Sequence, residues 1–216
     1  MKVKIKNNWN EITWNEYEQI EQILNADIPS DYKTVHLVSI LTGLSIDEVE
    51  SIPITQFQRL LPALEFIKKQ PKTHHHKFEY TVNGREYIFR GKLDEITTAQ
   101  YIDYRAQMSE EDKDVVNLFA CFLIPKGHDY NDGYDMDQVK SDIGDMNWLD
   151  VRAAAFFFRL QLATYILILK SSLRKTLKQA KATKKERKQV AESLNNMAYC
   201  LLYSKPANIV TLHSTQ

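Results

Sequence analysis

The sequence predicts a mainly α-helical protein: a helical bundle with a long C-terminal helical hairpin and one inserted β-hairpin. Only six glycines and six prolines occur among 216 residues, which favours long regular elements over loops. Apolar residues recur every three or four positions through most of the chain, as on the buried face of a helix. Residues 78–89 instead gather β-prone residues around Asn83-Gly84. We therefore expect at least half of the residues to be helical.

The first 70 residues predict four helices. Residues 13–16 and 45–48 have the spacing of capping boxes, in which a hydroxyl and a carboxylate accept hydrogen bonds from unpaired N–H groups at a helix start. Between them, residues 29–31 should end the first helix and cap a second one. Gly43 should end this second helix. The fourth helix contains Pro62, and we expect a kink or a break there.

Residues 78–82 and 85–89 are two β-prone runs joined by Asn83-Gly84. This dipeptide accepts the positive φ angles of a type I′ turn, so the sequence predicts a tight hairpin. A lone hairpin is marginally stable in water and must pack on helices or on strands of a neighbouring copy. We expect the turn to project from the helical body and one face to contact a partner chain through three aromatic side chains: Tyr80, Tyr87 and Phe89.

Helical periodicity resumes after the hairpin. Thr98 should lead one helix, and residues 109–112 have the spacing of another capping box. The helix that they cap is expected to run to about Pro125, with its apolar residues facing inward. A short helix should follow, capped by Asp135 or Asp137.

The last third of the chain predicts a long antiparallel helical hairpin. Its first helix should start after Asn147 and run to about residue 178, and its second should begin near residue 183 and end before Pro206. The whole chain then divides into an N-terminal helical region with the β-hairpin, a C-terminal helical region and a flexible tail: residues 1–92, 93–205 and 206–216.

The apolar stretch at residues 153–169 is interrupted by Arg159 and Gln161, and its uninterrupted part has only 8 residues. A membrane-spanning helix needs about 20 apolar residues. We expect a buried core helix here, no membrane segment, and no signal peptide at the start of the chain.

No pattern in the sequence predicts catalysis or a cofactor. The histidines of residues 74–76 are adjacent, so their side chains diverge and a solvated loop is favoured over a metal site. The acidic loop at residues 128–137 fails the register of an EF-hand, which leaves weak surface calcium binding as an alternative. Cys121 and Cys200 lie in apolar runs typical of core packing. We predict a non-enzyme with no metal or cofactor.

The charges are strongly segregated although the net charge is zero. Residues 94–150 carry 4 basic and 14 acidic groups, a net of 4 − 14 = −10, whereas residues 151–216 carry 12 basic and 2 acidic groups, a net of 12 − 2 = +10. The acidic part of one copy can therefore attract the basic part of the next and build a homo-oligomer. The alternative is that the two segments neutralise each other inside one monomer.

A basic cluster occupies residues 170–188, which contain one acid, Glu186. This cluster can contact a protein partner or hold phosphates by charge, without reading the bases. No aromatic residues interleave with it, so stacking on single-stranded nucleic acid is not indicated. The alternative is a solvated helix end, where cations are favourable. The residues that we expect to make contacts are Lys170, Arg174, Lys178, Lys181, Lys184 and Lys185.

Residues 11–67 resemble small helical proteins encoded among the virion and tail-assembly genes of tailed bacteriophages. The resemblance rests on residues 11–17, residues 39–49 and the apolar helix at residues 57–66. The Lys-, Asn-, Ile- and Tyr-rich, glycine-poor composition is similar to that of crAss-like phages of gut Bacteroidota. The resemblance implies a virion protein near the portal and tail, of ring or ejected cargo type. It transfers no functional residue, and the hairpin and long C-terminal helices exceed what is described for assembly chaperones of such phages.

Three functions from different classes follow from these observations. The first is a non-enzymatic structural protein of the virion, assembled in the host bacterial cytoplasm in several copies with phage portal or tail proteins, or carried as cargo. The second is a cytosolic tail-assembly chaperone that never enters the particle. The third is an unrelated interaction domain that contacts nucleic acid through the basic cluster.

Overall fold

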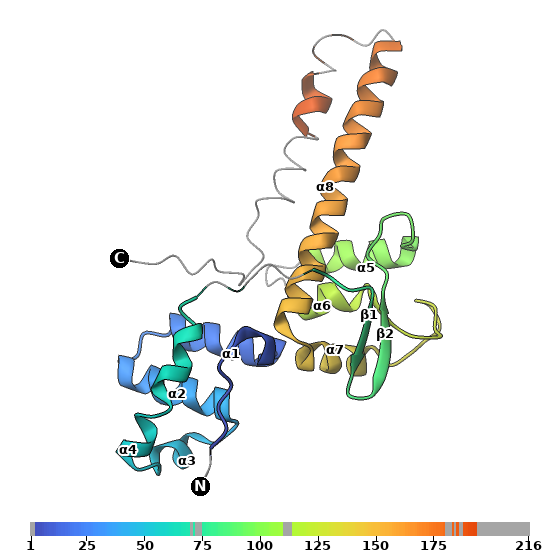
Figure 1. Cartoon of the computed structure of the whole chain (residues 1–216). Helices are drawn as coiled ribbons and strands as arrows, with labels where there is room; N and C mark the ends of the chain where they lie inside the picture. Colours follow the sequence, from blue (N-terminus) through green and yellow to red (C-terminus); the bar gives the residue numbers. More distant parts are fainter. Residues whose placement is uncertain are drawn as a thin grey trace.

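The computed structural model describes residues 3–69, 71, 75–109, 114–179, 183, 185 and 188–193. About 60% of the chain is helical, and one small antiparallel sheet of three strands accompanies the helices. The predicted fold class, mainly α with an inserted hairpin, is therefore confirmed. Figure 1 shows the short N-terminal helices on one side, the sheet with α5, α6 and α7 on the other, and the long helix α8 running between them and beyond.

The N-terminal region consists of short helices joined by tight turns. The predicted capping boxes at residues 13–16 and 45–48 both form, and Gly43 ends α2 with φ 72°. The expected cap at residues 29–31 is wrong, because Pro29 precedes α2 and no side chain caps it. The helix in this region is interrupted before Pro62, as predicted: α4 ends at Phe57, and η2 begins at Leu61. The elements are η1 (Trp9–Glu11), α1 (Trp14–Asn25), α2 (Ser30–Thr42), α3 (Ile46–Glu50), α4 (Ile54–Phe57) and η2 (Leu61–Phe66).

The hairpin forms as predicted, with β1 (Glu79–Val82) paired antiparallel to β2 (Arg85–Phe89). Asn83 and Gly84 have φ angles of 51° and 76°, the left-handed conformation that the tight turn requires. A third strand, β3 (Leu123–Pro125), pairs with the far side of β2, so the order is β1-β2-β3. Residues 121–125 were expected to continue a helix, and this expectation is wrong, because α6 ends at Ala120 and Leu123–Pro125 pair with β2.

The remaining helices are α5 (Thr98–Ser109), α6 (Val115–Ala120), α7 (Met136–Asp145) and α8 (Trp148–Gln179). Asp135 caps α7 and Asn147 accepts a hydrogen bond from the Leu149 amide at the start of α8, as predicted. α5 begins at Thr98, as predicted, and Thr97 and Gln100 cap it. The expected cap at residues 109–112 falls largely outside the described residues, and Asp114 caps α6.

One hydrophobic core connects the N-terminal helices to the sheet and to α8. Tyr17 of α1 stacks on Trp148 of α8 with ring centroids 4.2 Å apart, and Trp9 contacts both rings edge-on. The Trp14 amide also donates a hydrogen bond of 2.8 Å to the Met146 carbonyl. These contacts fix the N-terminal helices against the corner between α7 and α8.

Helix α8 has 32 residues, so at a rise of about 1.5 Å per residue it is about 48 Å long. Among its described side chains, the buried ones end at Ile166, and the part beyond stands clear of the sheet and of α5, α6 and α7 in Figure 1. We call residues 167–179 the α8 arm. The predicted length of this helix is confirmed, whereas most of its predicted antiparallel partner, residues 183–205, lies outside the described residues. No described helix is both long and apolar enough to cross a membrane.

Candidate interaction surfaces

The hairpin is held against α7 by one buried carboxylate. Asp142 accepts hydrogen bonds of 2.6 Å from both Nε and Nη2 of Arg85, one of 2.9 Å from the Asn83 side chain, and one from the Tyr87 hydroxyl. These bonds, the Arg85 guanidinium first among them, hold the pKa of Asp142 well below its usual range. Burial, followed by the bond to Asp142, raises the pKa of Tyr87 to about 12. The hairpin turn therefore lies on the helical body and does not project from it.

The three aromatic residues expected to contact a partner are inside the chain. Tyr80, Tyr87 and Phe89 are 5%, 1% and 1% exposed. Phe89 stacks on Phe119 of α6, and Tyr80 contacts the same ring edge-on. The prediction of an exposed aromatic face on the hairpin is therefore wrong, because α6, α7 and α8 supply the apolar cover that a lone hairpin lacks.

An acidic surface follows the loop before α7 and reaches α5. Tyr130 in this loop donates a hydrogen bond of 2.7 Å to Asp103 of α5, which joins the two elements. Some of the loop carboxylates accept local backbone hydrogen bonds: Asp132 from the Asp129 amide and Asp135 from the first turn of α7. All five carboxylates of the acidic surface are exposed, and they belong to Asp103, Asp129, Asp132, Asp135 and Asp137.

Several carboxylates of segment 94–150 form ion pairs with bases that precede the segment. Asp150 pairs with Lys77 at 3.0 Å, Asp142 with Arg85 at 2.6 Å and Asp129 with Arg90 at 3.0 Å. Only Asp129 of these three lies in the loop, and its partner Arg90 directly follows β2. The basic cluster begins where α8 leaves the body. The acidic loop and the described part of the α8 arm therefore lie in different parts of the molecule (Figure 1).

The predicted basic contact residues lie on and beyond the α8 arm. Lys170 is partly buried, and Lys185 is exposed. Arg174 and Lys178 lie on the helix, but their side chains are outside the described part. Lys181 and Lys184 lie wholly outside the described residues. Exposed apolar side chains accompany the cations along α8 and add surface that a partner can bury: Phe156, Leu160, Leu167, Ile168 and Leu173.

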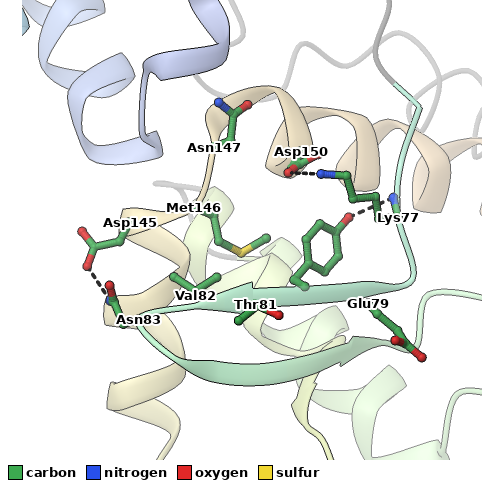
Figure 2. A pocket seen from close by; sticks show the side chains of 10 residues that line it. Lys77, Glu79, Thr81, Val82, Asn83, Asp145, Met146, Asn147 and Asp150 are labelled. Carbon is green, nitrogen blue, oxygen red and sulfur yellow. Dashed lines mark hydrogen bonds and ion pairs between the residues drawn. The ribbon is translucent and has the colours of Figure 1, made fainter.

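A polar groove lies between the outer edge of β1 and the corner between α7 and α8. Its volume is about 330 Å³. Figure 2 shows Lys77 at one end, donating to Asp150, and Asn83 at the other end, donating to Asp145. The sequence gives no signal for this groove, since its two walls are separated by more than 60 residues. The lining consists of Lys77 and residues 79–83 together with Asp145, Met146, Asn147 and Asp150.

The structure describes only some of the histidines and cysteines that the sequence singled out. Across the described ranges, no group of three or more His, Cys, Asp or Glu residues is placed to hold a metal ion. His74 lies outside these ranges, whereas the His76 ring stacks on Phe157 with centroids 3.8 Å apart. Burial, the largest cause, raises the pKa of the Cys121 thiol to about 11, which disfavours the reactive thiolate at neutral pH. Cys200 is outside the described residues.

No protein-family model, no curated protein and no solved structure matches this chain.

Proposed function

We propose that this chain is a non-enzymatic structural protein of a tailed-bacteriophage virion that assembles in several copies, either in the portal and tail region or as cargo in the particle. The observation that carries the proposal is the spatial separation of the acidic surface from the basic α8 arm. Charges that are neutralised within one monomer attract a second copy only weakly, whereas separated charges remain able to attract it. The resemblance of residues 11–67 to virion and tail-assembly proteins supports the phage assignment.

The contact between copies is head-to-tail. The basic end of one copy meets the acidic surface of the next, so each copy offers two different patches. A heterologous contact of this kind closes into a ring when the rotation between copies permits, and otherwise extends as a filament. The exposed apolar residues along α8 would be buried in the same contact. Their burial adds a favourable hydrophobic free energy that salt does not screen.

Charge reversal on the basic side tests the contact. We expect the fourfold variant Lys178→Glu, Lys181→Glu, Lys184→Glu and Lys185→Glu to lose self-association while it stays folded by circular dichroism. The matched control reverses four basic residues in the N-terminal region, so that both variants change the net charge by −8. These control residues are exposed and lie at positions Lys4, Arg59, Lys68 and Lys69. If both variants assemble like the wild type, the α8 arm is only a solvated helix end.

A second experiment distinguishes a virion component from an assembly chaperone. Mass spectrometry of purified particles should find this chain as a stoichiometric component. If particles lack it while their assembly requires it, the protein is a tail-assembly chaperone. Salt-dependent DNA binding that the fourfold variant loses, without any self-association of the wild type, would instead identify a nucleic-acid contact.

A further inference from the structure

The outer edge of β1 offers unused backbone hydrogen-bonding groups. Phe89 donates an amide hydrogen bond of 2.7 Å to the Phe78 carbonyl, and the register pairs Tyr80 with Tyr87. Pairs that exchange hydrogen bonds alternate with pairs that do not, so the N–H and C=O groups of Glu79 and Thr81 point away from β2. Within the described part of the chain, no hydrogen bond occupies these groups. The edge is therefore a template for one more strand.

The groove beside this edge has the shape for a single extended segment. One wall is β1, and the other is the corner between α7 and α8, with the Met146 side chain pointing toward the strand in Figure 2. A strand added to a sheet lies about 4.8 Å from its neighbour, so an added segment would lie against β1 along the groove. Binding by strand addition takes its affinity from main-chain hydrogen bonds and its specificity from the side chains at the walls.

The charges of the groove select the chemistry of the segment. Glu79, Asp145 and Asp150 contribute three carboxylates, and Lys77 contributes the one ammonium group of the lining. Lys77 is bonded to Asp150 at one end, whereas Asp145 is exposed at the other end beside Asn83. An extended segment without acidic residues, and with a basic residue at the Asn83 end, would complement this arrangement.

We propose that this groove binds residues 207–213 of a second copy, which add to β1 as an antiparallel strand. The segment reads Ala-Asn-Ile-Val-Thr-Leu-His, is rich in β-prone residues and carries no acid. Lys205 precedes it, and antiparallel addition brings Lys205 to the Asn83 end, near Asp145. These residues lie outside the described part of the chain. The inference rests on the proposed function, because it names a strand that joins the same head-to-tail contact as the basic cluster.

Proline substitutions test the added strand. Thr81→Pro removes the outward N–H group of β1 without removing a hydrogen bond to β2, and proline is tolerated at such edge positions. We expect Thr81→Pro to assemble only at concentrations at least tenfold higher than the wild type, whereas Thr81→Ala assembles normally. Val210→Pro, with Val210→Ala as its control, should have the same effect from the other side. If Thr81→Pro does not fold, the Val210 pair carries the test alone.

A mixing experiment distinguishes a second copy from the same chain. Thr81→Pro keeps an intact segment and Val210→Pro keeps an intact groove, so a mixture of the two full-length variants should form a heterodimer of twice 25.2 kDa by native mass spectrometry. A mixture that stays monomeric overturns the proposal, since the segment then does not bind in trans. If charge reversal abolishes assembly but both proline variants assemble normally, the groove proposal fails while the proposed function stands. If none of the variants differs from the wild type, both fail.

Discussion

Replacing Asp142 with Asn tests whether one carboxylate fixes the sheet to the helices. The carboxylate is fully buried and accepts hydrogen bonds from Arg85, Tyr87 and Asn83, and a longer one from Gln138. The substitution keeps the volume but leaves the Arg85 guanidinium without its counter-charge. Breaking a buried ion pair from one side costs about 3–5 kcal/mol. Because the Arg85 side chain is 47% exposed and can be partly rehydrated, we expect a loss of about 3 kcal/mol, the lower end of that range.

The assay is urea denaturation followed by circular dichroism, with Asp145→Asn as the matched control. Asp145 lies one turn further along α7, is exposed, and accepts one hydrogen bond of 2.9 Å from Asn83. A surface change of this kind alters stability by about 0.5 kcal/mol or less. If Asp142→Asn costs no more than Asp145→Asn, the hairpin is held by apolar packing alone and the reasoning is refuted.

Two further properties follow from the hairpin and its anchor. Because the pKa of Asp142 is lowered in the folded state, its contribution to stability is present above the unfolded-state pKa of about 3.9 and is lost as the pH falls towards the folded value. The free energy of unfolding should therefore decrease more steeply below about pH 4 in the wild type than in Asp142→Asn, as acid titrations of both proteins will show. Gly84→Val should destabilise the chain by about 2 kcal/mol or more in the same urea assay, since a β-branched residue resists the φ angle of 76° at this position. Gly84→Asn should cost much less, because Asn tolerates left-handed backbone, and equal losses for the two variants would contradict this reading of the turn.

Several local sequence signals predicted the local structure, although the cap expected at residues 29–31 does not form. Each capping box at residues 13–16 and 45–48 needs only two side chains three positions apart, and both form. The Asn83-Gly84 turn requires only two residues that accept positive φ, and both adopt it. The long helix α8 was predictable because its apolar residues keep helical spacing for many turns. None of these features depends on a distant part of the chain.

The sequence did not predict features that depend on distant partners. The apolar run at residues 121–125 fits a helix or a strand equally well, and pairing with β2 decides between them. The aromatic residues of the hairpin were expected to face a partner, because nothing local shows that Phe119 covers them. Asp142 looks like any other acid of its segment, since Arg85 lies 57 residues away. The groove beside β1 could not be predicted either, because its two walls are far apart in the sequence.

The most direct test of the account is the native mass of the purified protein across a series of salt concentrations. The account predicts multiples of 25.2 kDa at low ionic strength that fall towards 25.2 kDa as salt rises to about 1 M, where the screening length is only about 3 Å. The charge contact between copies is then removed, and the apolar contact along α8 and the added strand at β1 hold the copies only weakly. A mass of 25.2 kDa at every salt and protein concentration would contradict the account, and so would an assembly whose mass is indifferent to salt.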